Sequence, residues 1–439
     1  MPITAVTRTT DFCGQLTDAA ATPLPPAAAA AAKRSLFNVL GTAVGAARTP
    51  GVDAIVAAAA RLSAPGTAAV LGRSDVLDEH WAALLTGTAA HYDDFDDTHL
   101  ATVIHPGAAV LGVLVALHDQ AAVDGDRCLR AFALGCEAQL RIGNAISPNH
   151  YDRGWHITGT CGVFGAAVAA AVLLGFDSDA LESALAAAST MTLGHREAFG
   201  SMTKPFHAGK AAANGVLAAR LAVGGYPGLA DPLGDSGVLT IFADAADDGA
   251  LLRSWSDPWE LESNTFKPYP CGIVAHPAID AAVEAGRRVT DPARIESVEV
   301  VCHPLVPELM GRLQPEDGLQ ARFSARHGVA VGLIDGSGGL AEFSDARATS
   351  PDVQRLRAVT ELLPAPDCAR DAATITVRLA GGEDVRVHVP HARGSLARPL
   401  TDAELLTKVD TLTQPLLGTG SATSILRSVE ALDRAPDFT

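Results

Sequence analysis

Aromatic and charged residues are scarce in this 439-residue chain, at 5% and 19% of the total. Basic residues are fewer than acidic ones, with 33 Lys and Arg against 50 Asp and Glu, so the formal net charge is −17. An acidic surface repels polyanions, and we therefore expect no nucleic acid and no anionic membrane among its partners. A small anionic substrate remains compatible, because a local cluster of Lys and His can outweigh the overall field inside a cleft.

The seven cysteines show no CxxC spacing, which argues against zinc-ribbon, thioredoxin-like and iron–sulfur sites. Their scatter and odd number predict free thiols in a reducing compartment. The stretch MPITAVTRTTDFCG lacks the basic-then-apolar pattern of a secretion signal. The apolar stretches are interrupted by Gly, His or charge, so we expect no membrane span. The sequence thus predicts a cytoplasmic protein.

Alanine and glycine are abundant, and hydrophobic residues make up 48% of the chain. The length predicts two domains. Over residues 1–266 the apolar residues recur at helical spacing, as in CLRAFALGCEAQLRIGNAI, and we find no convincing strand pair. This part is predicted to be an all-helical domain.

Strands are predicted in a second, smaller α+β domain over residues 267–395. The stretch ATITVRLAGGEDVRVHV alternates on either side of Gly381-Gly382, which predicts a hairpin with one face in water. Thr401 and Glu404 then form a capping box that opens a helix. We therefore expect residues 396–439 to return to the helical domain and complete it. The predicted fold class is mainly α with a second α+β domain.

The first cluster with chemical potential is HYDDFDDTHLATVIHPG, residues 91–107. Four carboxylates and three imidazoles are costly to bury unless they pair. One interpretation is a solvated loop between helices. A second is a magnesium–diphosphate motif like the DDxxD of helical isoprenoid synthases, although no second metal motif or aromatic-lined cavity is evident. The third is an Asp–His constellation for proton transfer, in which the carboxylate fixes the imidazole tautomer.

Two further clusters precede helices. In RGWHITGTCGVFGAA, His156 stands before Thr158–Gly162, whose backbone N–H groups at a helix start could receive an anion. A helix cap is the simpler interpretation of this histidine. In GSMTKPFHAGKAA, the potential cations Lys204, His207 and Lys210 oppose the dipole of the helix that follows. They favour a bound carboxylate, with surface lysines as the alternative.

The fourth cluster, FKPYPCGIVAHPA, lies at the predicted domain junction. Pro268 and Pro270 stiffen it, so Lys267 and Tyr269 would be held in place. A linker is the alternative, but clefts between domains commonly bind ligands. Together the four clusters predict a pocket of His, Lys and Asp, without metal-ligand spacing, that suits small di- or tricarboxylates. Lys and imidazole donors would stabilise the charge that builds on a carboxylate when a neighbouring proton is removed.

These stretches, with PLTDAEL near the C-terminus, resemble the MmgE/PrpD family in order and over nearly the full length. That family includes 2-methylcitrate dehydratase, cis-aconitate decarboxylase and iminodisuccinate epimerase. The resemblance implies a homodimer, in keeping with the apolar composition. It also implies a large helical domain, a smaller lid domain, and cofactor-free chemistry on polycarboxylates in the cleft between them.

Position by position, the resemblance places the family's active-site residues on Asp94, His105, His156, Lys204 and Lys267. The two histidines are acid/base candidates, and the aspartate is the orienting group or the base. The two lysines are expected to clamp carboxylates.

We add Thr158, His207 and Tyr269 as expected substrate-binding residues. Two departures concern the decarboxylase branch. Gly272 stands where that branch has a histidine, and His327, which ends RFSARH, stands where it has a tyrosine. We keep His327 as a catalytic candidate and expect His276 to be structural.

These departures argue against a straightforward cis-aconitate decarboxylase. We therefore expect a metal-independent carbon–oxygen lyase that dehydrates a 2-methylcitrate-like hydroxy acid. An epimerase or isomerase that returns the same proton, and a decarboxylase of a cis-aconitate-like acid, remain alternatives. A catalytically silent helical binding protein is the alternative outside enzymes.

Overall fold

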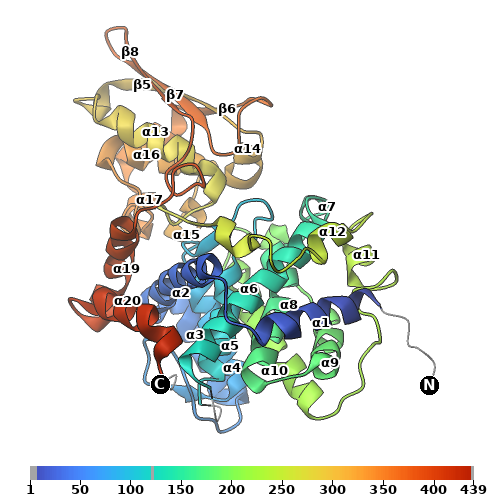
Figure 1. Cartoon of the computed structure of the whole chain (residues 1–439). Coiled ribbons are helices and arrows are strands. Elements are labelled where there is room, and N and C mark those ends of the chain that lie inside the picture. Colours follow the sequence, from blue (N-terminus) through green and yellow to red (C-terminus); the bar gives the residue numbers. More distant parts are fainter. Residues whose placement is uncertain (1–6, 120–122, 437–439) are drawn as a thin grey trace.

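A computed structural model describes residues 7–119 and 123–436. Two layers of structure are visible in Figure 1: a helical body that carries the N-terminus, and a sheet-containing domain above it. The predicted fold class is therefore confirmed. The outermost residues of the predicted helical domain, at both ends of the chain, lie outside the described residues.

The helical body is built from elements that precede residue 264. They are α1 (Arg8–Ala20), α2 (Pro26–Ala46), α3 (Pro50–Leu62), α4 (Glu79–His91), α5 (Pro106–Ala116), α6 (Gly125–Ile146), α7 (Asn149–Asp152), α8 (Ile157–Leu174), α9 (Ser178–Ser189), α10 (Thr203–Val223), α11 (Val238–Phe242) and α12 (Asp248–Leu251). The expectation of no strand pair here was wrong. β1 (Ala68–Ala69) pairs with β2 (Val76–Leu77), and β3 (Asp97–His99) pairs with β4 (Asn264–Phe266). Two or three residues are too few to show an alternating pattern.

Small residues set the crossing of α4 and α10 at the centre of this body. A Cβ on Gly209 would lie 2.1 Å from the Leu84 carbonyl oxygen, and a Cβ on Gly87 would lie 2.9 Å from Gly209 Cα. Only glycine permits this approach of two backbones. The crossing brings His91, at the end of α4, close to the first turn of α10.

Helix α8 is long and apolar enough to cross a membrane, with a mean hydropathy of 2.0 over 18 residues. Length and composition alone make it a candidate, and the sequence analysis expected no membrane span. In the structure 89% of this helix is buried within the protein, between α6, α10 and α5. It is the central helix of the core, and its small residues let its neighbours pack closely against it.

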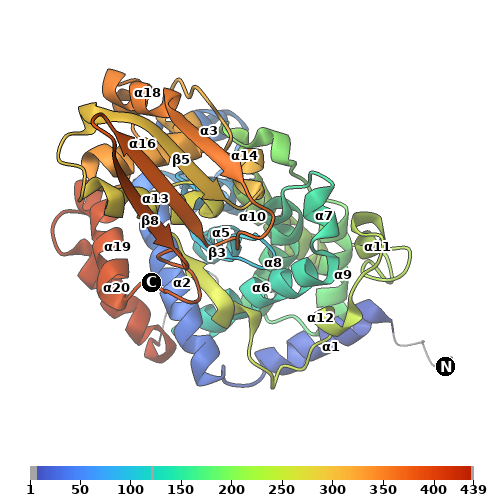
Figure 2. The ribbon, with the colours of Figure 1, turned by 90° about the horizontal axis from the view of Figure 1, so that it is seen from above.

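The second domain contains a four-stranded mixed sheet in the order β6-β5-β7-β8. Its strands are β5 (Ile295–Cys302), β6 (Thr360–Pro364), β7 (Ala373–Leu379) and β8 (Glu383–Val389). β7 and β8 form the predicted hairpin, with Ile375 opposite Val387 and both turn glycines at positive φ. Alternate residues of each strand are buried against α13 (His276–Gly286) and α16 (Ala325–Asp335), which lie on one face of the sheet (Figure 2).

Shorter helices complete the second domain: α14 (Leu305–Met310), α15 (Gly318–Ala321), α17 (Asp345–Ala348) and α18 (Pro351–Ala358). The chain then returns to the helical body through α19 (Asp402–Leu417) and α20 (Ser421–Ala431), with 3₁₀ turns between several elements. The predicted capping box is present, since Thr401 and Glu404 bond each other's backbone N–H. Val409 of α19 packs on α2, where a Cβ on Gly41 would lie 2.9 Å from its methyl groups.

Candidate active site

The β3–β4 pair brings together two segments that are distant in the sequence. Asp97 lies opposite Phe266 in this ribbon, so the loop before β3 meets the residue that follows β4. That residue is Lys267, which is buried and donates from Nζ to Asp94 Oδ1 at 2.7 Å and to the Asp94 carbonyl at 3.0 Å. The strand register therefore forms the first ion pair of the site.

A second lysine reaches the same carboxylate oxygen. Lys204, in the first turn of α10, donates from Nζ to Asp94 Oδ1 at 2.5 Å. Burial by itself raises the pKa of Asp94, but the ammonium groups of Lys204 and Lys267 outweigh it and hold that pKa well below its ordinary value. Asp94 also adopts a left-handed backbone conformation, with φ of 52°, which is strained for a residue with a Cβ. The aspartate is thus a fixed anion that positions two ammonium groups.

A second carboxylate, Asp96, faces two imidazoles. Its oxygens lie 2.7 Å from His91 Nδ1 and 3.1 Å from His105 Nδ1. An ionised carboxylate can only accept hydrogen bonds, so His91 Nδ1 carries the proton. The hydrogen bond of His105 Nδ1 is with Thr98 Oγ1 at 3.1 Å, and the adjacent charge of Asp96 favours the tautomer with hydrogen on Nδ1 and a lone pair on Nε2. Nε2 of His105 lies 3.8 Å from Asp94 Oδ1. Burial lowers the pKa of His105 to about 4, so this imidazole is a neutral base at physiological pH.

His156 approaches from the start of α8. It occupies the N-cap position of that helix, yet its side chain makes no capping hydrogen bond, and the same holds for His105 at the start of α5. His156 Nδ1 instead lies 2.9 Å from His207 Nδ1, and its ring packs edge-on against Phe199 with centroids 5.1 Å apart. Burial, reinforced by the neighbouring histidines and Lys204, holds the pKa of His156 well below its ordinary value. The rings of His105 and His156 are therefore neutral, and neither ring caps its helix.

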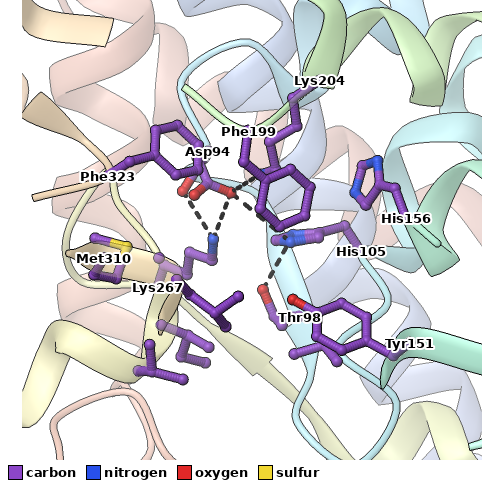
Figure 3. Close-up of a pocket in the computed structure, with 15 residues that line it drawn as sticks. Asp94, Thr98, His105, Tyr151, His156, Phe199, Lys204, Lys267, Met310 and Phe323 are labelled. Carbon is purple, nitrogen blue, oxygen red and sulfur yellow. Dashed lines mark hydrogen bonds and ion pairs between the residues drawn. The ribbon is translucent and has the colours of Figure 1, made fainter. Parts of the chain in front are cut away.

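These groups line one small cavity of about 50 Å³ (Figure 3). Its lining residues are Asp94, Thr98, Val103, His105, Tyr151, His156, Phe199, Lys204, Lys267, Gly272, Ile273, Val274, Leu309, Met310 and Phe323. The starts of α5, α8 and α10 all meet here, which adds the positive ends of their dipoles. A cavity of this size has room for a few waters.

An open cleft of about 830 Å³ lies next to this cavity. The two share Phe199, Leu309 and Phe323, which form the partition between them. Arg153, Arg196 and other charged side chains line the cleft. Its position makes it the route by which a substrate would reach the buried groups.

The sequence-predicted residues divide into three groups. Asp94, His105, His156, Lys204 and Lys267 meet at the cavity. His207 and Thr158 lie behind it: His207 contacts His156, and Thr158 Oγ1 accepts the backbone N–H of His105 at 3.2 Å. Both support a cavity residue instead of lining the cavity.

Tyr269 and His327 do not reach the cavity. The Tyr269 hydroxyl donates to Asp280 at 2.5 Å within the second domain. His327 lies in the first turn of α16, where Nε2 is 2.8 Å from the Glu342 carbonyl and the ring packs on Phe343. Both side chains, predicted as a substrate-binding residue (Tyr269) and a catalytic residue (His327), point into the core of the second domain. In the segment RFSARH the cavity residue is Phe323.

The acidic stretch 91–107 is buried rather than solvated, and its members have separate tasks. Asp93 pairs with Arg322 of the second domain at 2.7 Å. Asp97 accepts from Asn264 Nδ2 at 2.6 Å and from Ser35, which fastens the β3–β4 pair to α2. His99 contacts Thr102 at 2.9 Å. These three residues hold the loop that carries Asp94 and Asp96.

A metal ion is geometrically conceivable at one place. The nearest potential ligand atoms of His91, Asp94, Asp96 and His105 all lie within 4.8 Å of one another. Two ammonium groups already contact Asp94 Oδ1, so a divalent cation at this oxygen would meet two positive charges. The donor set therefore fits an anion next to the lysines better than a cation among the carboxylates.

Sequence reasoning missed His91, Asp96 and Lys408. Asp94 and Asp96 lie in the turn before β3, where Asp94 has a φ of 52°, so no regular spacing could have identified Asp96. Lys408 of α19 is buried and donates to the Phe95 carbonyl at 2.6 Å and to the Lys267 carbonyl at 2.9 Å. Nothing local in the sequence predicts that contact, because it spans more than 300 residues.

Comparison with known proteins agrees with this arrangement. Residues 10–248 match the MmgE/PrpD N-terminal domain, and residues 269–434 match the MmgE/PrpD C-terminal domain. The chain is 28% identical over 387 residues to cis-aconitate decarboxylase of Mus musculus, covering 84% of this chain and 79% of that protein. It is 28% identical over 386 residues to the Homo sapiens protein of the same name, covering 84% and 80%. With cis-aconitate decarboxylase of Aspergillus terreus it shares 25% identity over 462 residues, covering 98% and 94%.

Proposed function

The chain belongs to the MmgE/PrpD family of lyase-type enzymes, and from this premise we propose that it removes water from a small hydroxy-polycarboxylate of the 2-methylcitrate kind without a metal ion. The observation that carries the proposal is the meeting of a lysine pair and an Asp-backed histidine at one buried cavity. The lysines suit a carboxylate, and the histidine suits the proton next to it.

The lysines have donors to spare. An ammonium group has three N–H bonds, and the contacts to Asp94 use one on Lys204 and two on Lys267. The remaining N–H bonds can hold a substrate carboxylate. When the adjacent C–H bond breaks, negative charge builds on that carboxylate, and two fixed ammonium groups in a buried site stabilise it strongly.

His105 is placed to take the proton. Asp96 keeps the hydrogen on Nδ1, so Nε2 is free to accept, and burial keeps the ring neutral. The electrons of the C–H bond form the new C=C bond as the C–O bond breaks. The departing hydroxide takes up the proton that His105 has gained and leaves as water. His156 also lines the cavity and orients the hydroxyl.

A second candidate is decarboxylation of a cis-aconitate-like acid. It is favoured by the relatives that the chain matches, all four of which are named cis-aconitate decarboxylase. Two departures noted above argue against it. Gly272 stands where the decarboxylase branch has a histidine, and the segment ending at His327 stands where that branch has a tyrosine. Neither Gly272 nor Phe323, the cavity residue of that segment, can deliver a proton to carbon.

Proton NMR of 2-methylcitrate in D₂O with the purified protein tests the proposal. An alkene signal that persists after dialysis against EDTA supports dehydration. Deuterium uptake without an alkene would mean epimerisation, release of labelled CO₂ from cis-aconitate would mean decarboxylation, and loss of turnover in EDTA would contradict a metal-free reaction. The homodimer and the cytoplasmic location remain predictions, which light scattering and cell fractionation can check.

A further inference from the structure

The two sides of the cavity differ in chemistry. The helical side and the domain junction supply its ionisable groups, with Asp94, His105, His156, Lys204 and Lys267. The second domain supplies six residues that we call the lid wall: Gly272, Ile273, Val274, Leu309, Met310 and Phe323. No side chain of the lid wall carries a strong hydrogen-bond donor or acceptor. Figure 3 shows Met310 and Phe323 facing Asp94 and Lys267 across the cavity.

Met310 fills the space that a side chain at position 272 would need. A Cβ built on Gly272 would lie 2.4 Å from Met310 Sδ. Met310 is itself buried, and it ends α14, the helix that brings Leu309 to the cavity. Because position 272 has no side chain, the thioether of Met310 forms this part of the cavity surface. Methionine is flexible and adapts to apolar groups of differing shape.

Two phenylalanines extend the apolar surface up to the lysine. The rings of Phe199 and Phe323 lie 5.9 Å apart, and Lys204 Nζ lies 5.4 Å and 5.5 Å from their centroids. A carboxylate bound by Lys204 would therefore have aromatic faces beside it. If a second carboxylate of the same substrate faced the lid wall, it would lose its hydrating water and find no side chain there to replace the lost hydrogen bonds.

We propose that the lid wall determines substrate specificity by receiving a short alkyl substituent of the acid whose carboxylate the lysine pair holds. This rests on the proposed function. Met310 and Phe323 are the main specificity-determining residues, since Phe323 lies beside Lys204 and Met310 fills the space at position 272. The preferred substrates are thus polycarboxylates that carry an alkyl branch, rather than unbranched acids with the same carboxylates.

Calorimetry with succinate and 2-methylsuccinate on the full-length protein tests the proposal without any turnover. These acids carry the same two carboxylates and differ by one methyl group. We expect the methylated acid to bind at least about fourfold more tightly, which is the effect of burying one methyl-sized group. Lys204→Met should abolish binding of both acids, which places them in the cavity.

Met310→Gln replaces the thioether with an amide of similar size and should bring the two affinities together. Leu313→Gln is the matched control: it lies in the same domain, is 55% exposed and does not line the cavity. It should leave the preference intact. Equal or reversed affinities in the unaltered protein would overturn the role of the lid wall while leaving the proposed function standing. Failure of both acids to bind would contradict the proposed function itself.

Discussion

Asp96 lies between two imidazoles of the site, 2.7 Å from His91 Nδ1 and 3.1 Å from His105 Nδ1. In the proposed reaction its charge favours hydrogen on Nδ1 of His105 and so leaves Nε2 to accept a proton. Asp94, two residues earlier, instead positions Lys204 and Lys267. The pair of aspartates thus separates two tasks, one for the base and one for the anion-binding cations.

Asp96→Asn tests this division. An amide can donate to His105 Nδ1 and so favour the tautomer with hydrogen on Nε2, which cannot accept a proton. We expect kcat to fall by about a hundredfold or more, with KM little changed because the lysine pair is untouched. Steady-state kinetics measures both constants. A variant with normal kcat would show that Asp96 does not set the tautomer.

At the residue scale, a side chain of the site could be predicted only where the local sequence indicates its position. The clusters around Asp94, His156 and Lys204 were visible as polar stretches in an alanine-rich chain, and the resemblance selected their members. The direction of Tyr269 and His327 could not be predicted. The direction of Tyr269 depends on its contact with Asp280. The direction of His327 depends on where α16 begins and on its contact with Glu342.

At the scale of elements, the crossing of α4 and α10 sets the distance between His91 and Lys204. Gly209→Ala would place a methyl group 2.1 Å from Thr88 Oγ1 and the Leu84 carbonyl, so the helices must separate. We expect a loss of about 1–3 kcal/mol in the free energy of unfolding, as for other overpacked cores.

Thermal or denaturant unfolding measures this loss. Gly224→Ala, at the C-terminal cap of the same helix, is the control. Its nearest neighbours would be 3.4 Å away, so its stability should change little. Equal stability of the two variants would mean that the crossing is looser than the structure indicates.

The return helix α19 contributes to the site through Lys408. Its ammonium group joins the Phe95 carbonyl to the Lys267 carbonyl, and so links the two segments that carry Asp94 and Lys267. Lys408→Met should lower kcat/KM about tenfold or more, as is typical of groups that support active-site residues.

Lys33→Met serves as the matched control, because Lys33 pairs with Asp433 at 2.8 Å on the outer side of α2. Its kcat/KM should stay normal. If Lys408→Met also kept normal kinetics, α19 would be a purely structural element.

The hairpin and the α19 capping box were predictable because their signals are local. The β3–β4 pair and the Lys408 contact were not, because they depend on tertiary proximity alone.

For the whole molecule, buried neutral histidines predict sensitivity to acid. Burial lowers the pKa of His105, His207 and His327 to about 4, below the value of about 6.5 in an unfolded chain. Between pH 6.5 and 4 the unfolded state therefore binds more protons, and the free energy of unfolding falls as the pH falls. Burial raises the pKa of Asp97 to about 6 and also raises those of Asp93, Glu137 and Glu182, which acts in the opposite direction. The histidines are more numerous, because burial also lowers the pKa of His150 to about 4 and that of His276 to about 3.

We expect a Tm that is clearly lower at pH 5 than at pH 7. Differential scanning calorimetry at fixed ionic strength measures it. A Tm that stays level or rises towards pH 5 would mean that these histidines are not buried as neutral groups.

The central claim is that His105, backed by Asp96, breaks a C–H bond beside a carboxylate held by the lysine pair. The most direct test is the rate of alkene formation from 2-methylcitrate in His105→Gln and His118→Gln. The two histidines flank the ends of the same helix, α5, but only His105 lines the cavity, and His118 contacts the Val115 carbonyl instead. We predict that His105→Gln loses a hundredfold or more of the rate, as is typical of a lost general base, while His118→Gln retains most of it. A His105→Gln protein that forms the alkene at the normal rate would contradict the account.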